Sequence, residues 1–128
     1  MSFEIFDYLD AHGDNAFKEW WSGLQKKERA KLRSRITMLR DYGEDIRPQI
    51  LTDTPVPGIL KLRVHGNVQL RPLLCKGPAK NDAEFTMLMG ATERDFKLVP
   101  EDAPETADAR KTAIARDNKR RTKHVPVT

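Results

Sequence analysis

Apolar residues recur at helical spacing in two segments near the start of the chain. In the first, four apolar residues lie at i, i+3, i+4 and i+7, behind a polar turn whose Asp14 or Asn15 can cap a helix. In the second, the apolar stripe ends at Gly43, a natural helix stop, and the opposite side is basic. The two stripes are Phe17, Trp20, Trp21 and Leu24, and then Leu32, Ile36 and Leu39. Phe3, Ile5 and Tyr8, ahead of them, predict a short first strand.

From Ile59 the pattern changes to strict alternation, which predicts a hairpin that turns at Gly66-Asn67. A loop with an odd number of residues pairs Lys61 with Leu73 and Arg63 with Arg71. That register buries one face, whereas a slip by one residue would bury charge. It also gathers cationic side chains on one exposed face, namely Lys61, Arg63, His65 and Arg71. Pro72 has no N–H to donate, so we expect a sheet edge or a bulge there.

The remaining segments complete an α+β pattern. Residues 44–58 hold three prolines and indicate a loop, and residues 84–91 predict another strand. Residues 92–97 are dense in charge and indicate a loop, after which Asp102 can cap a last helix over 104–119. We therefore expect a small antiparallel, mixed-edge sheet with two N-terminal helices packed on one face and a C-terminal helix. The division expected is a domain over 1–109 and a basic helix end and tail over 110–128.

Composition narrows the class of protein. The chain has 128 residues, 38% of them hydrophobic, which suits one compact core. No run of 18 apolar residues predicts a membrane helix, and the start MSFEIFDYLD does not resemble a secretory signal. The single cysteine, Cys75, cannot form an internal disulfide, and no Cys/His cluster suggests zinc. We expect a cytoplasmic protein without a metal or cofactor.

Charge is concentrated near the end of the chain. Seven basic residues and one acidic residue between 110 and 123 give a local charge of +6, whereas the whole chain carries +4. Such a segment can attract a polyanion, and it can equally be a solvated helix with a frayed tail. The hairpin adds a second signal. Arg63 directly opposite Arg71 is repulsive unless an anion lies between them, which suggests a phosphate site.

The order of these elements resembles the RelE/ParE toxin superfamily, in its phage-derived, HigB-like branch. The resemblance covers residues 17–116. It is carried by Phe17-x-x-Trp20, by RITMLRDYG (35–43), by GILKLRVHGNVQLRPLL (58–74) and by FTMLMGATERDFKLVP (85–100). Its most specific feature is Leu62-Arg63 followed by Arg71 on the return strand.

This resemblance implies the toxin of a type II toxin–antitoxin pair, a ribosome-dependent mRNA endonuclease that uses the 2′-OH of RNA and no metal. By position, Lys61 matches the base, Arg71 the residue that stabilises the transition state, and Arg94 the residue that acts on the leaving group. Arg63, His65 and Lys97 are then expected to bind substrate, with Lys97 as a substitute for Arg94 and His65 as a second possible base. The implied partners are a small antitoxin of helix-turn-helix type and mRNA on the ribosome, and a homo-oligomer is possible.

The chain also departs from the branch, which leaves two alternatives open. Glu93 stands where a basic residue is usual, the expected aromatic residue of that loop is missing, and Pro72 replaces an aliphatic residue. These changes favour a non-catalytic relative that binds RNA or a protein partner. A ParE-like poison of a protein target is the other alternative, against which the retained Lys61, Arg63 and Arg71 argue.

Overall fold

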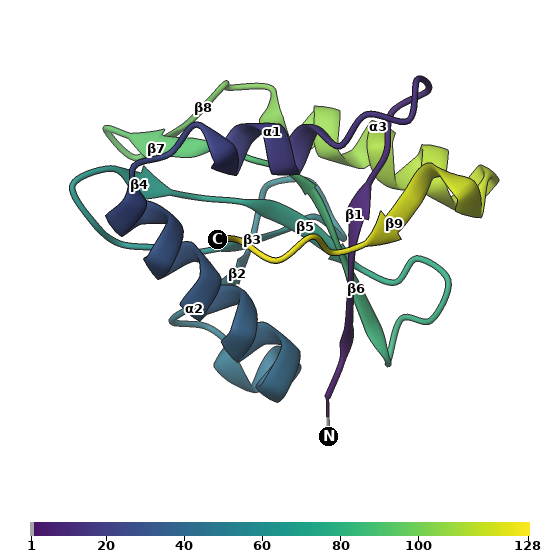
Figure 1. Ribbon diagram of the computed structural model, residues 1–128, viewed down its shortest axis with the longest axis horizontal. Coiled ribbons are helices and arrows are strands. Elements are labelled where there is room, and N and C mark those ends of the chain that lie inside the picture. The colour runs from purple at the N-terminus through teal and green to yellow at the C-terminus, as the bar shows by residue number, and fades with distance from the viewer. Residues whose placement is uncertain (1) are drawn as a thin grey trace.

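The protein folds as an α+β unit built on a mostly antiparallel sheet, as its sequence predicts. The structure is a computed structural model that describes residues 2–128 (Figure 1). A six-stranded sheet has the order β2-β3-β5-β6-β1-β9, and a three-stranded sheet has the order β4-β7-β8. Only β1 and β6 pair in parallel within these residues. The strands are β1 (Glu4–Tyr8), β2 (Leu51–Asp53), β3 (Leu60–Leu62), β4 (Gln69–Leu70), β5 (Leu73–Lys76), β6 (Glu84–Met89), β7 (Thr92–Arg94), β8 (Lys97–Val99) and β9 (Arg121–Lys123).

The two N-terminal helices form where the apolar spacing predicts them. Helix α1 (Ala16–Ser22) is capped by Asn15, whose side chain accepts a hydrogen bond from Lys18 N at 3.0 Å. Helix α2 (Lys26–Tyr42) ends at Gly43, which has a φ of 56°. A Cβ at residue 43 would lie 2.5 Å from the Phe3 ring, so both the backbone conformation and the packing require glycine.

Two hydrophobic clusters occupy the two sides of the large sheet. The first joins α1 and α2 to residues of β3, β5 and β6 that include Leu62, Leu74 and Met87. The second joins helix α3 (Ala103–Arg116) to Leu73, Cys75 and Leu88. Neighbours on β5 therefore alternate between clusters, as the two-residue period of a strand requires. Cys75 is buried in this second cluster, and burial raises the pKa of its thiol to about 12.

The predicted register of the hairpin is confirmed. Leu60 pairs with Leu74, Lys61 with Leu73, and Val64 with Leu70. The return strand is interrupted at Arg71-Pro72, close to the irregularity that proline predicts. Because of that interruption, β4 leaves the large sheet and pairs with β7, while β5 continues between β3 and β6.

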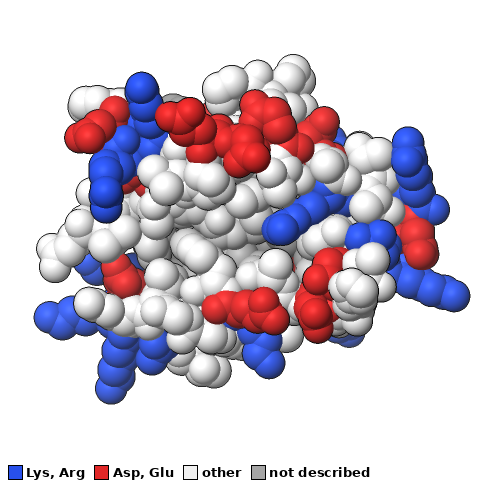
Figure 2. Space-filling view, turned by 90° about the horizontal axis from the view of Figure 1, so that it is seen from above, with Lys and Arg blue, Asp and Glu red and all other residues white. Residues whose placement is uncertain are grey.

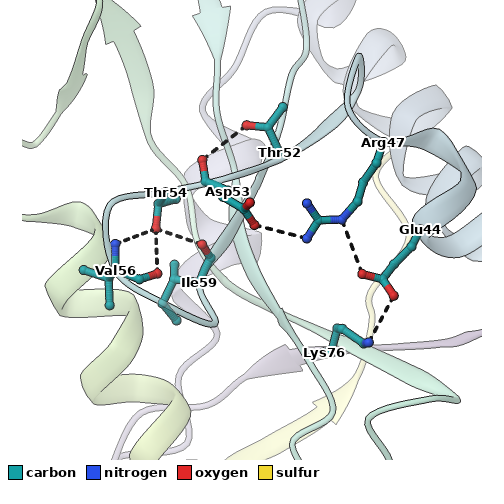
Figure 3. Close-up of polar contacts among 8 residues, drawn as sticks. All are labelled: Glu44, Arg47, Thr52, Asp53, Thr54, Val56, Ile59 and Lys76. Carbon is teal, nitrogen blue, oxygen red and sulfur yellow. Dashed lines mark hydrogen bonds and ion pairs between the residues drawn. The ribbon is translucent and has the colours of Figure 1, made fainter.

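Two of the predicted loops contain regular structure. The segment over 44–58 holds the 3₁₀ helix η1 (Gly43–Ile46) and the edge strand β2. Polar contacts fix it, because Glu44 bridges Lys76 and Arg47, Arg47 reaches Asp53, and the Thr54 hydroxyl donates to Ile59 O (Figure 3). The prediction of an irregular loop over 92–97 is also wrong. It is the β7–β8 hairpin, whose two-residue turn places Asp95 and Phe96 at φ values of 52° and 64°.

The basic C-terminal segment is ordered rather than frayed. After α3, a 3₁₀ turn η2 (Asn118–Arg120) leads into β9, which pairs antiparallel with β1. Several of its arginines are used inside the molecule. Arg120 donates to Tyr8 Oη at 2.7 Å, and Arg121 pairs with the buried Glu84 and lies over the Phe6 ring. Among the helices of residues 2–128, none combines the length and the apolar character needed to cross a membrane.

Candidate functional site

Lys61 and Arg71 converge on one carboxylate oxygen. Lys61 Nζ lies 3.7 Å from Glu93 Oε1, and Arg71 Nε lies 3.5 Å from the same atom. The three side chains come from β3, from the link between β4 and β5, and from β7. The sequence therefore places Lys61 and Arg71 correctly on one side of the sheet, where an oxyanion can lie between them.

Arg71 is buried, which overturns the expectation that it lies on an exposed face. Only 2% of its side chain is accessible, and it borders a hollow that Glu93, Asp95 and Phe96 of the β7–β8 hairpin also line. Its Nη1 donates to Leu70 O at 2.8 Å, but Nε is buried and has no hydrogen-bond partner among the described residues. Burial lowers the pKa of the guanidinium, the nearby charge of Arg63 lowers it further, and Glu93 opposes both effects.

Backbone pairing explains why Glu93 reaches this position. Arg71 N donates to Ala91 O at 2.8 Å, and Gln69 pairs directly with Glu93 across β4 and β7. Because paired residues of antiparallel strands share a face, Glu93 and Gln69 lie side by side. The chain turns from β6 into β7 at Gly90, where a Cβ would lie 1.8 Å from the Trp20 ring, so glycine lets the strand pass beneath the indole.

His65 lies on the other side of Gln69 from Glu93. Its Nδ1 is 2.9 Å from Gln69 Oε1, and Gln69 Nε2 donates to Gly66 O at 3.0 Å. Both histidine and glutamine line a hollow of about 400 Å³ together with Arg71, Glu93, Asp95 and Phe96. That volume lies within the range of small-molecule sites. His65 therefore faces the same space as the buried arginine.

A second hollow, of about 370 Å³, lies beyond Glu93 and shares Glu93 and Phe96 with the first. Lys61 and Lys97 line it, but so do Glu93, Glu101 and Glu105. The strongly cationic face that the sequence suggests is therefore neutralised by carboxylates. Seen from above, acidic side chains gather along the upper edge, and basic side chains lie at the lower left and at the right of a largely uncharged area (Figure 2).

Of the other predicted site residues, Arg63 lies near the buried centre of the site, whereas Arg94 and Lys97 lie on the β7–β8 hairpin. Arg63 is half-buried beside Arg71, and its charge acts on Arg71. Lys97 lines the second hollow, whereas Arg94 is exposed at the end of β7 and lines neither hollow. Arg94 pairs in register with Lys97, so both belong to the hairpin rather than to the buried centre.

Sequence reasoning missed the roles of Glu93, Gln69 and Phe96. In the sequence Glu93 is visible only as a departure from the family pattern, because its contact with Arg71 depends on the long-range pairing of β4 with β7. The position of Phe96 could have been recognised locally, because an aromatic residue directly between the charged Asp95 and Lys97 is expected to be exposed. It is 98% exposed at the hairpin tip and lines both hollows.

The site thus combines two cations at one point, a carboxylate, an oriented imidazole and an exposed aromatic ring. Such a set can hold an oxyanion, transfer protons and stack on a planar group. Comparisons of this chain with protein-family models, with curated proteins and with solved structures found no match.

Proposed function

We propose that this protein is an endoribonuclease that cuts mRNA on the ribosome, the toxin of a type II toxin–antitoxin pair. The observation that carries the proposal is the convergence of Lys61 Nζ and Arg71 Nε on one carboxylate oxygen, at 3.7 and 3.5 Å. A point where two cations already hold an oxyanion is suited to a phosphate group, which presents the same kind of oxygen. The resemblance of residues 17–116 to the RelE/ParE superfamily supports the same reading.

RNA supplies its own nucleophile, so the protein has to align the 2′-OH, move its proton and stabilise the charge that develops on phosphorus. Arg71 supplies a planar guanidinium whose Nε lies 3.5 Å from Glu93 and makes no hydrogen bond among the described residues, and Lys61 supplies a second positive charge. Arg63 and Lys97 are then in place to bind neighbouring phosphates, and Phe96 is exposed for stacking on a base.

The proposed partners are mRNA on the ribosome and a small helix-turn-helix antitoxin. We infer that the antitoxin covers the mouth of the two hollows. Displacing α3 instead would expose Ala103, Ala107 and Ile114, which are fully buried against the sheet. Covering the hairpin would exclude RNA without that loss.

A non-catalytic relative that binds RNA or a protein is the second candidate. It is favoured by Glu93, which already occupies the point between the cations, and by Glu101 and Glu105 beside Lys61. Carboxylates in these positions weaken the attraction of a phosphate chain.

The test is primer extension on mRNA bound to purified ribosomes and mixed with the purified protein. We expect cleavage by the wild-type chain, and its loss in Lys61→Ala and Arg71→Lys. Lys80→Ala, in an exposed turn, is the matched control. Arg121→Lys is the control for a largely buried arginine outside the site. The same chain is also expressed in cells, where growth arrest without mRNA cleavage would select the poison of a protein target, and neither effect would select the non-catalytic relative.

A further inference from the structure

Two groups able to move protons, Glu93 and His65, line the same hollow as Arg71. Glu93 lies on β7 opposite Gln69, and His65 is hydrogen-bonded to Gln69 from the other side. All four side chains line the same space of about 400 Å³. A carboxylate and an imidazole that share a hollow with a cation are the groups that acid–base cleavage of RNA needs.

We propose that Glu93 and His65 are the general base and the general acid of RNA cleavage at this site, in place of Lys61 and Arg94. This inference rests on the proposed function and assigns its two proton transfers. Lys61 and Arg71 then act through charge alone.

The ion pair itself argues against Lys61 as the base. As the partner of a carboxylate, Lys61 is an ammonium, and an ammonium has no lone pair with which to accept a proton. Glu93 is the unprotonated member of the pair. Its contacts at 3.5 and 3.7 Å are longer than those of a charge-assisted hydrogen bond, which leaves its lone pairs available. A fifth of its side chain is exposed, so a substrate hydroxyl can reach it.

Gln69 fixes the orientation of His65. Because Gln69 Nε2 donates to Gly66 O, Oε1 is the atom that faces the ring, and it accepts the proton of Nδ1. The other nitrogen, Nε2, makes no hydrogen bond with any residue from 2 to 128. In the imidazolium form it carries a proton that it can donate to substrate. An imidazole oriented by a third group is typical of catalytic histidines.

Cleavage proceeds with two proton transfers. Glu93 accepts the proton of the 2′-OH, and the 2′ oxygen forms a bond to phosphorus. The bond between phosphorus and the 5′ oxygen breaks, and that oxygen takes the Nε2 proton of the His65 imidazolium. The products are a 2′,3′-cyclic phosphate and a free 5′-OH, with Glu93 protonated and His65 neutral. Exchange with water restores both groups.

Charged groups from several elements face the pair and shape its response to pH. Lys61 of β3 and Arg71 face Glu93, together with Lys97, Glu101 and Glu105 across the second hollow. His65 is faced by Asp95 of the hairpin turn and by Lys27, Glu28 and Lys31 of α2. Rates should therefore be measured at one fixed ionic strength across the pH range.

The experiment measures single-turnover cleavage of mRNA on programmed ribosomes between about pH 5.5 and 9. General acid–base catalysis contributes roughly 10²–10⁴-fold, so we expect Glu93→Gln and His65→Ala each to cut at least about 100-fold more slowly. Binding of an mRNA whose reacting 2′-OH is replaced by hydrogen should be unchanged. Glu93→Asp should recover part of the rate, which tests the carboxylate should Glu93→Gln fold poorly.

A modified substrate isolates the acid. With sulfur in place of the 5′ oxygen the leaving group departs as a thiolate and needs no proton, so this mRNA should restore cleavage by His65→Ala but not by Glu93→Gln. The controls are His12→Ala, in an exposed turn, and Glu44→Gln, another carboxylate that bridges two cations.

Three results would overturn the inference. Cleavage by Glu93→Gln at the wild-type rate or faster would show that Glu93 only occupies the phosphate position. Failure of the sulfur substrate to restore His65→Ala would remove His65 as the acid. In both cases the wild-type chain still cuts RNA and the proposed function stands. A wild-type chain that cuts no ribosomal mRNA would end the proposed function, and this assignment with it.

Discussion

Arg71 is the residue at which stability and the proposed chemistry conflict. Its side chain is 2% exposed, yet its partner Glu93 is 3.5 Å away and Nε has no hydrogen bond among residues 2–128. A buried charge with loose pairing costs desolvation that its Coulomb attraction only partly offsets. Such an arrangement is expected where a site is prepared for a ligand, because the ligand completes the pairing.

Arg71→Met should therefore change the free energy of unfolding by less than about 1 kcal/mol, because Glu93 keeps Lys61 at 3.7 Å and a fifth of its side chain is exposed, so no buried carboxylate is left without a cation. The measurement is the free energy of unfolding in urea. Arg121→Met is the contrasting variant. It leaves the carboxylate of Glu84, which is 3% exposed, without its cation, and should lower the free energy of unfolding by about 3–5 kcal/mol. Equal losses for the two variants would mean that Arg71 is as well paired as Arg121.

At the scale of elements, the β7–β8 hairpin decides the form of the site, and its turn carries backbone strain. Asp95 and Phe96 both have positive φ, which costs a residue with a Cβ about 1–2 kcal/mol. Phe96 is 98% exposed, so its ring contributes little to folding. Phe96→Gly should stabilise the protein by about 1 kcal/mol. Val68→Gly, at an exposed residue without positive φ, should destabilise it instead. Thermal unfolding of both variants distinguishes the turn effect from the loss of an exposed apolar side chain.

The contacts of η1 provide a test that depends on pH. The hydrogen bond and charge of Lys76, with the charge of Arg47, hold the pKa of Glu44 below its ordinary value of 4.5 (Figure 3). A carboxyl whose folded pKa is depressed stabilises the fold above its unfolded pKa, and that stabilisation is lost as pH falls through the folded value. Glu44→Gln should therefore be less stable than wild type near pH 7, by less than about 1 kcal/mol because these groups are exposed. The difference should shrink below pH 4.5 and in about 1 M salt. A difference independent of pH would assign it to packing.

The elements also show what the sequence can and cannot predict. The hairpin register followed from one local requirement, that Leu60, Leu62 and Val64 share a buried face. The sequence pattern did not predict strand β2, because it is a short edge strand among prolines. It did not predict β7 and β8, because their residues are mostly charged. The meeting of Glu93 with Arg71 depends on the pairing of β4 with β7, which joins segments more than 20 residues apart. Alternation within one segment carries no information about such a pairing.

At the scale of the whole molecule, residues 124–128 contact both the sheet and the N-terminal helices. Val127 is 2% exposed within the cluster that α1 and α2 share with the sheet. Arg29 of α2 donates to Thr128 O at 2.8 Å. The fully buried Asp7 of β1 accepts hydrogen bonds from His124 Nδ1 at 2.7 Å, Val125 N at 3.0 Å and Asn15 Nδ2 at 2.9 Å. One carboxylate thus joins β1, the start of α1 and the C-terminal segment.

This arrangement predicts that Asp7 and residues 124–128 stabilise the protein as one unit. Asp7→Asn should cost about 1–3 kcal/mol, because the amide leaves buried donors without the acceptor that the carboxylate provides. A chain that ends at Lys123 should also lose stability, but Asp7→Asn within that shorter chain should cost much less, since two of the three donors are then gone. Urea unfolding of the four proteins gives the coupling energy directly. The carboxylate of Asp10 accepts from His12 N and Asp14 N in its own turn, so Asp10→Asn should be additive with the same truncation. Additivity for Asp7 as well would mean that the C-terminal segment is held by Val127 and the α2 arginines, and that the buried carboxylate acts only on α1.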